Sequence, residues 1–188
     1  ASVVHDTRDS VFLTRKGHKL ELGGTYSGLG GDVDDYGLNV QATQYIHLPG
    51  DTILSFDGAI RTVDGSDQVP IFDRQFLGGA NNLRGFDYRD VGPKDENGEP
   101  LGGQTAAYFS VEYTFPIMEK IRGAVFYDVG SVSTDSFDLG GEVNSNVGIG
   151  LRLYLPIGPI RVDFGIPMQT DEWNDSGGKF NFNVGYKF

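Results

Sequence analysis

The chain has 188 residues, including 28 glycines, 13 phenylalanines and 9 tyrosines, with no cysteine and a net charge of −11. This length predicts one domain over residues 1–188, with a core that needs no disulfide or structural zinc site. The acidic balance argues against a nucleic-acid binder, because phosphate contacts need clustered Lys and Arg. No run of about 18 apolar residues predicts a transmembrane helix, and the first residues lack the pattern of a signal peptide.

Apolar and polar residues alternate along most of the chain, which is typical of β-strands with two different faces. In chain order, a weak strand at 2–9 is followed by stronger ones near 18–27, 36–48, 52–63, 105–115, 121–130, 147–155, 160–166 and 179–188. We therefore expect eight strands and a ninth, weaker one at the N-terminus. Their lengths cluster near the roughly 10 residues that a tilted strand needs to cross a bilayer.

The predicted connections alternate in length. Short turns are expected at 15–17, 49–51, 116–120 and 156–159, and long polar stretches at 28–35, 64–103, 131–143 and 168–178. Tight turns at one rim and long loops at the other are typical of an outer-membrane barrel. We therefore expect an all-β, antiparallel transmembrane β-barrel with short periplasmic turns and long extracellular loops. A soluble β-sandwich or lipocalin-like barrel is the alternative, since its strands also alternate.

The polar faces of the predicted strands hold many charged residues. They are Asp57, Arg61, Glu112, Arg122, Asp128, Arg152, Arg161 and Asp163. In a soluble sandwich these residues would face solvent, whereas in a membrane barrel they would line a wet lumen and pair with one another there.

One long loop contains the most distinctive segment, 76–86, which reads Phe-Leu-Gly-Gly-Ala-Asn-Asn-Leu-Arg-Gly-Phe. It resembles the Gly-Gly…Arg-Gly-Phe motif of the BamA-type family of outer-membrane assembly and translocation barrels. Three more matches follow in the family's order: the aromatic-x-Asp-x-Gly segment 126–130, the hairpin 148–160 with its Pro-x-Gly-Pro turn, and the last strand, 180–188. The resemblance covers the chain from about residue 70 onward, and the residues before it fit only as further strands.

The resemblance implies that this loop docks inside the lumen against acidic residues of two strands. The loop residues are Gly78, Gly79, Leu83, Arg84, Gly85 and Phe86, and their acidic partners are Glu112 and Asp128. The residues support the same contact, because the glycines permit positive φ angles and Arg84 offers a planar fork of five donors. In an antiparallel hairpin with its turn at 116–120, the numbers of two paired residues should add up to about 236. Residue 112 then lies near 124 and residue 108 near 128, so both carboxylates share one face. The alternative is that Arg84 caps an external loop and Asp128 binds water.

The resemblance also implies a lateral gate and an assembly signal in the last strand. The residues concerned are Phe180, Phe182, Val184, Gly185, Tyr186 and Phe188. An exposed strand edge pairs readily with another chain, and a glycine such as Gly185 weakens a strand locally. Phe188 is equally expected as an aromatic anchor at the membrane interface.

By resemblance, the protein is integral to the bacterial outer membrane of Gram-negative type and inserts client outer-membrane β-barrel proteins. The implied partners are outer-membrane lipid, lipopolysaccharide and periplasmic assembly lipoproteins. A translocation pore of two-partner secretion or of the translocation-and-assembly module stays open, as does a structural eight-stranded barrel. Family members have about 16 strands after periplasmic domains, so the chain either lacks an N-terminal barrel half, closes alone, or pairs with a second copy as a homodimer.

No arrangement of reactive side chains predicts an enzyme. His5, His18 and His47 lie in separate segments without metal-binding spacing. The acidic stretches 32–35 and 95–99 lack the full ligand series of a calcium loop, and weak divalent binding is the most they offer. No nucleophile elbow or phosphate-binding loop is present. We expect no catalytic residue, no resident metal and no cofactor.

Overall fold

The structure, a computed structural model, describes residues 1–28, 34–65, 69–155, 158–172, 174 and 176–185. Within these residues, nine antiparallel strands form one sheet in which each strand pairs with its neighbours along the chain. The strands are Ser2–Asp6 (β1), Gly17–Ser27 (β2), Asp35–Leu48 (β3), Thr52–Gly65 (β4), Thr105–Met118 (β5), Ile121–Ser133 (β6), Val143–Leu155 (β7), Gly158–Gln169 (β8) and Lys179–Val184 (β9). The predicted all-β antiparallel architecture is confirmed, including the weak N-terminal strand.

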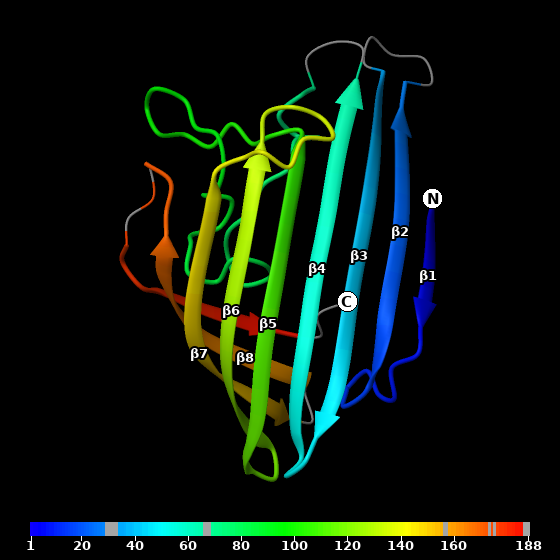
Figure 1. The fold of residues 1–188 in the computed structure, drawn as a ribbon, viewed down its shortest axis with the longest axis vertical. Helices are drawn as coiled ribbons and strands as arrows, with labels where there is room; N and C mark the ends of the chain where they lie inside the picture. Colours follow the sequence, from blue (N-terminus) through cyan, green and yellow to red (C-terminus); the bar gives the residue numbers. More distant parts are fainter. Residues whose placement is uncertain (29–33, 66–68, 156–157, 173, 175, 186–188) are drawn as a thin grey trace.

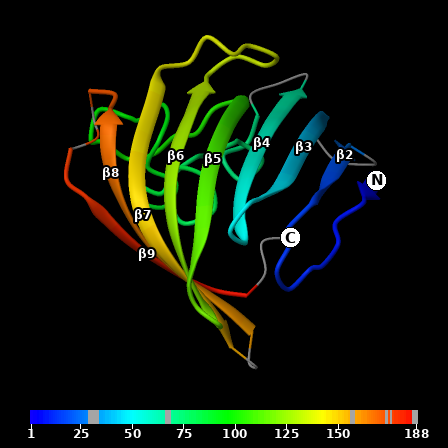
Figure 2. The ribbon, with the colours of Figure 1, turned by 60° about the horizontal axis from the view of Figure 1, so that its bottom comes forward.

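The sheet curves into an open trough with β1 and β9 at its two edges (Figure 1). No pairing joins β1 to β9 among the described residues, so the sheet is not closed there. The long connection between β4 and β5 folds back onto the concave side of the trough (Figure 2). The concave side therefore corresponds to a lumen that is already partly filled by this loop.

The two faces of the sheet differ in polarity as the alternation predicts. On β5 and β6, Phe109 and Val125 are exposed on the convex face, whereas Ser110 and Asp128 are buried on the concave face. Apolar residues exposed along the other strands include Leu22, Val40, Ile60, Ile149, Phe164, Phe180 and Phe182. An apolar outer face with a polar inner face is the arrangement of a membrane barrel and the reverse of a soluble sandwich. No helix among the described residues is long and apolar enough to span a membrane.

The first connection differs from the prediction. β1 ends at Asp6 and β2 begins at Gly17, so segment 7–16 replaces the expected strand end and the short turn at 15–17. Polar side chains fold this segment locally: Asp9 accepts hydrogen bonds from the backbone amides of Arg15 and Lys16. The backbone amides of Thr7 and Asp9 still donate to the carbonyls of His18 and Lys16, so pairing with β2 weakens gradually. Residue alternation does not show where such a strand ends and side-chain hydrogen bonds take over.

The predicted register of the β5–β6 hairpin was wrong by two residues. Ser110 lies opposite Asp128, and Glu112 lies opposite Phe126. The shift arises because β5 continues through a register irregularity at 116–118, which leaves only residues 119 and 120 in the turn. Glu112 and Asp128 are therefore diagonal neighbours on the concave face, and diagonal neighbours remain within reach of one long side chain. Of the other turns, the one at 49–51 is as predicted, and residues 156 and 157 lie outside the described residues.

The docked loop contributes apolar side chains to the main buried cluster of the molecule. Loop residues Leu77, Leu83, Phe86 and Val91 pack with Ala59, Ala106, Tyr108 and Val132 of the sheet. Leu83 is 0% exposed and directly precedes Arg84. Since burying a large apolar side chain contributes roughly 1.5–3 kcal/mol, this cluster fixes the loop on the sheet and sets the position of Arg84.

Candidate functional site

The loop approaches the sheet through a tight turn that begins at two glycines. Gly78 and Gly79 have φ angles of 110° and 95°, in the region that favours glycine. The Asn82 side-chain oxygen accepts hydrogen bonds from the backbone amides of Gly78 and Leu83, both at 2.7 Å. The amide of Gly79 donates to the carbonyls of Leu83 and Phe86, both at 3.1 Å. The turn therefore satisfies its own backbone and directs Arg84 toward the concave face.

Arg84 and Asp128 form the centre of the site. The guanidinium donates from Nε and Nη2 to the two carboxylate oxygens of Asp128, at 2.9 and 2.7 Å. The backbone amide of Arg84 donates to the same carboxylate at 3.2 Å. Ser110 and Asn146 donate to it as well, at 2.6 and 3.0 Å. Asp128 is 0% exposed, so its charge is compensated entirely by these contacts.

The same guanidinium makes contacts beyond Asp128. Its Nη1 lies 2.5 Å from Oε2 of Glu112, and its Nη2 donates to Ser110 Oγ at 3.0 Å. Its central carbon lies 3.5 Å from the ring centroid of Phe126, which gives a cation–π contact. The structure thus brings Arg84, Glu112 and Asp128 together, and it places the loop inside the trough rather than outside it.

A second arginine extends the site across β7 and β8. Arg152 donates from Nε and Nη2 to the two oxygens of Glu112, at 3.0 and 2.6 Å, and from Nη1 to Asp163 at 2.6 Å. Asp163 also lies 3.9 Å from Nη1 of Arg84. Two arginines and three carboxylates therefore form one buried network, which we call the arginine network: Arg84, Glu112, Asp128, Arg152 and Asp163. Glu112 is its shared member.

The last strand contacts the loop through two asparagines. The Asn181 amide donates to the backbone carbonyl of Arg84 at 2.6 Å, and the Asn183 amide donates to the side-chain oxygen of Asn81 at 3.1 Å. The loop backbone also lies close against β8, because a β-carbon at Gly165 would meet the Arg84 carbonyl oxygen at 2.6 Å. The inner face of β9 is therefore tied to the loop that Arg84 anchors.

The residues predicted for the lateral gate lie on the other face of the same strand. Phe180, Phe182 and Val184 are 70%, 61% and 57% exposed, and they point away from the arginine network. Gly185 follows the described strand with a φ angle of 115°. Tyr186 and Phe188 lie outside the described residues.

Known proteins resemble this chain in sequence and in fold. The model of the Omp85 superfamily domain matches residues 1–188. The chain belongs to the Omp85 superfamily. Outer membrane protein assembly factor BamA of Nitratidesulfovibrio vulgaris is 31% identical over 100% of this chain and 26% of its own length. A SAM50-like protein of Schizosaccharomyces pombe is 29% identical over 97% of this chain and 42% of its own length.

Two solved structures share the fold of this Omp85 chain. BamA of Haemophilus ducreyi lacking POTRA domains 1–3 superimposes with a TM-score of 0.84 at 21% identity, over 96% of this chain and 40% of that one. CdiB of Acinetobacter baumannii gives a TM-score of 0.66 at 16% identity, over 96% of this chain and 31% of that one. The chain thus spans between about a quarter and two fifths of the length of these four proteins. Its sheet is part of an integral outer-membrane β-barrel.

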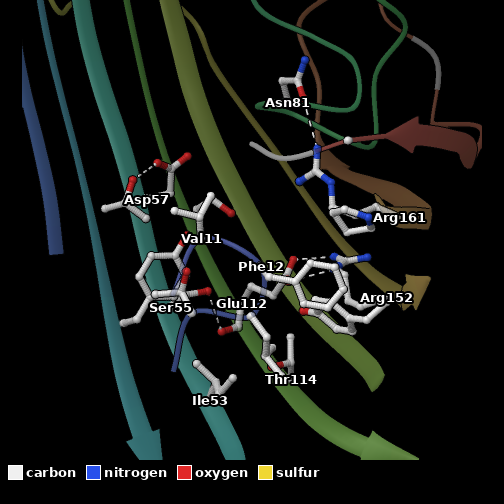
Figure 3. A pocket seen from close by; sticks show the side chains of 18 of the residues that line it. Val11, Phe12, Ile53, Ser55, Asp57, Asn81, Glu112, Thr114, Arg152 and Arg161 are labelled. Carbon is white, nitrogen blue, oxygen red and sulfur yellow. Dashed lines mark hydrogen bonds and ion pairs between the residues drawn. The ribbon is translucent and has the colours of Figure 1, made fainter. Parts of the chain in front are cut away.

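At the short-turn end of the Omp85 sheet, segment 7–16 crosses the concave side. It borders a cavity of about 150 Å³ that Glu112 and Arg152 line from the sheet (Figure 3). The Phe12 ring lies 5.4 Å from that of Tyr154 on β7. Segment 7–16 therefore closes part of the route between this end of the trough and the arginine network.

Asp51, in the β3–β4 turn, joins three parts of the chain at this end. It accepts hydrogen bonds from Arg15 of segment 7–16 at 2.8 Å and from Arg122 of β6 at 2.9 Å, and His47 lies 3.5 Å away. The hydrogen bond from Arg15 is the main cause that lowers the pKa of Asp51 from 3.8 to about 2. Arg122, predicted to pair with acids in the lumen, pairs here instead, because its long side chain extends to this end of the sheet.

The acidic stretches and histidines do not gather into a metal site among the described residues. Asp95 accepts hydrogen bonds from the backbone amides of Asn97 and Glu99, at 2.8 and 2.9 Å, which lowers the pKa of its carboxyl. This carboxylate therefore organises a turn of the outer loop. Asp32 lies outside the described residues.

Several residues of the site were not assigned from the sequence. Arg152 and Asp163 were expected on the inner face, but nothing in the spacing linked them to Arg84. Asn146 and Asn181 had only their inward position in the alternation as a signal. Phe126 was part of the family motif, yet its role as the ring beneath Arg84 depends on the register of β5 and β6.

Proposed function

We propose that the protein containing this chain assembles client β-barrel proteins into an outer membrane, and that it does so without enzymatic chemistry. This proposal rests on the match of the whole chain to 26% of an outer membrane protein assembly factor, combined with a loop that is bound to the concave face through Arg84. A SAM50-like relative matches over 97% of the chain, which supports the same function.

The proposed working element is the edge at β9. A strand edge presents unpaired backbone groups, and each such group in lipid costs several kcal/mol. A client strand that pairs with this edge removes that cost and enters the bilayer already hydrogen-bonded. Asn181 and Asn183 hold the inner face of β9 to the loop, so opening at β9 requires these two hydrogen bonds to break.

The two faces of the sheet indicate which partners the protein would meet during the proposed assembly of client barrels. The exposed apolar convex face fits outer-membrane lipid, and the long polar loops fit the headgroup region where lipopolysaccharide lies. We include periplasmic assembly lipoproteins among the proposed partners. The open edges of β1 and β9 are proposed to pair with a missing N-terminal barrel half; the alternative is a second copy of the chain in a homodimer. A translocation pore is the second candidate function, supported by the likeness of fold to CdiB.

Reconstitution of the full-length protein in liposomes tests the proposal. An unfolded client barrel should fold faster in these liposomes than in empty ones, and cysteines placed at Asn181 or Asn183 should crosslink to the client's terminal strand. A cysteine at Ile60, on the convex face of β4, is the matched control and should give no crosslink. Client folding at the rate of empty liposomes, with ion conductance present, would contradict assembly and favour the translocation pore.

A further inference from the structure

A second cavity lies between the docked loop and the concave face of β3, β4 and β5. Its volume is about 510 Å³, and it is lined by Gln41, Arg61 and Tyr108 from the sheet and by Arg74, Phe76 and Arg89 from the loop. The described lining residues include three arginines and no carboxylate. The cavity wall is therefore positively charged, although the chain as a whole has a net charge of −11.

The three arginines differ from those of the arginine network in their partners. Arg61 donates from Nε to Asn39 at 3.3 Å, and Arg74 donates to two backbone carbonyls. The Arg89 guanidinium lies 4.3 Å from the ring centroid of Phe76. Within the described part of the chain, none of the three forms an ion pair. Among these described residues, none of the three guanidinium groups is therefore held in a salt bridge, and the Asp57 carboxylate accepts hydrogen bonds from Gln41 and Tyr108 of the same wall rather than from these arginines.

The chemistry of the wall fits an extended peptide that bears carboxylates. A guanidinium fork binds a carboxylate through two parallel hydrogen bonds. The Asn82 side-chain oxygen is engaged in the loop turn, but the NH2 group of this amide is a further donor for a peptide backbone on the same wall. Phe76 and Tyr108 add apolar surface between the charges. A rigid anion such as inorganic phosphate would use the charge but not the amide and aromatic groups.

The end of the β4–β5 connection shows the composition that such a peptide would have. Residues 95–103 contain Asp95, Glu96 and Glu99 and no Lys or Arg. This chain is itself an outer-membrane barrel segment, and a client barrel has to move loops of the same kind across the membrane. The cavity and such loops are therefore complementary in charge.

We propose that the cavity between the loop and β3–β5 binds an acidic, extended segment of a client protein during its passage through the lumen. The identity of the client rests on the proposed assembly function, whereas the binding of an acidic peptide does not. Arg61 and Arg89 bind the carboxylates, and Arg74 keeps the loop in place through its contacts with the carbonyls of Val69 and Leu101.

A labelled peptide with the sequence of residues 95–103 tests the proposal by fluorescence anisotropy, with the full-length protein in detergent. The matched peptide has its three acids replaced by Asn and Gln. We expect the acidic peptide to bind at least about tenfold more tightly, the size of one charge-assisted hydrogen bond. Equal affinities, no binding of the acidic peptide, or equally tight competition by inorganic phosphate would each overturn the proposal.

Variants then locate the site. Arg61→Gln with Arg89→Gln should weaken the acidic peptide about tenfold or more. Lys16→Gln with Lys120→Gln removes the same charge from the short-turn end and should leave binding unchanged. If the two double variants bound the acidic peptide with equally reduced affinity, the assignment to this cavity would be overturned. Client insertion is measured separately: insertion without peptide binding rejects only the cavity, whereas peptide binding without insertion rejects only the assembly function.

Discussion

Asp128 holds Arg84 by both its side chain and its main chain. The carboxylate accepts the guanidinium at 2.9 and 2.7 Å and the backbone amide of the same residue at 3.2 Å. A contact with the guanidinium alone would allow the loop to swing about the long arginine side chain. Because the backbone is bound as well, the direction in which the loop leaves the sheet is also set. This explains how the Arg84 carbonyl comes to face Asn181 on β9.

Arg84→Ala should destabilise the protein by about 3–5 kcal/mol, because it leaves the buried Asp128 without a cation. Asp128→Asn should cost less, about 1–3 kcal/mol, since Arg84 keeps Glu112 as a partner. Urea titrations of the reconstituted protein measure both free energies of unfolding. Lys16→Ala, at an exposed site, is the control. Equal losses in the two variants would contradict this ranking.

Exchange of the two charges is expected to fail as a rescue. In Arg84→Glu with Asp128→Arg, the new glutamate would face Glu112, whose carboxylate lies 2.5 Å from Arg84 in the native protein. We therefore expect the double variant to be no more stable than Arg84→Ala and its loop to be open to protease. A double variant close to wild type in protease resistance would show that Glu112 contributes little to the network.

Glu112 should couple the two arginines energetically, since each donates to its Oε2 atom, at 2.5 and 2.6 Å. Arg84→Ala removes one of these partners and also the neighbouring positive charge. The effects of Arg84→Ala and Arg152→Ala should therefore deviate from additivity by about 0.5–3 kcal/mol. A double-mutant cycle on the free energy of unfolding measures the deviation. Additivity within about 0.3 kcal/mol would mean that the two arginines act independently.

The sequence predicted those features that depend on alternation and on residue chemistry. The strand order, the polar inner face and the contact of Arg84 with two acids all follow from period-two patterns and from a motif. Positions that depend on the number of residues in a turn could not be predicted from these patterns. β5 extends to Met118, so the turn holds only residues 119 and 120 and the β5–β6 register differs by two residues from the predicted one, which puts Ser110 opposite Asp128.

Contacts made by uncharged residues were also beyond the sequence. Asn181 looks like any inward polar residue of a barrel strand, and its bond to the Arg84 carbonyl depends on where the loop backbone lies. Segment 7–16 was read as a strand end and a turn because its side-chain hydrogen bonds leave no periodic signal. For Asn181 the missing information was the position of a distant loop, and for segment 7–16 it was a set of local side-chain hydrogen bonds.

Asn181→Ala and Asn183→Ala should each loosen β9. Loss of one hydrogen bond of about 0.5–1.5 kcal/mol corresponds to faster amide exchange in residues 180–184 by roughly twofold to tenfold. Hydrogen exchange with mass spectrometry measures this in the full-length protein. Thr43→Ala, which removes a hydroxyl that donates to Asp57 on β4, is the control and should leave β9 unchanged. Unchanged exchange in both asparagine variants would show that the loop does not restrain the last strand.

Acid should release segment 7–16 through Asp51. The pKa of this carboxyl is lowered from 3.8 to about 2 in the folded protein, mainly by the hydrogen bond from Arg15. A lowered folded-state pKa gives a stabilisation that is complete above the unfolded pKa and is lost as the pH falls through the folded one. The contact should therefore persist at pH 5 and disappear between about pH 4 and pH 2.

A fluorophore on a cysteine placed at Ser10 reports this release through its accessibility to a soluble quencher. Quenching should rise over that pH interval in the wild type and should already be high at pH 7 in Asp51→Asn, which removes the charge. His47→Gln removes the other titratable group beside Asp51, which lies 3.5 Å away, and should leave the acid midpoint in place. A rise in quenching that persists in the wild type but is abolished in His47→Gln would contradict the role of Asp51. Because Asp51 also accepts a hydrogen bond from Arg122 of β6, the same protonation should also weaken the contact between the β3–β4 turn and β6.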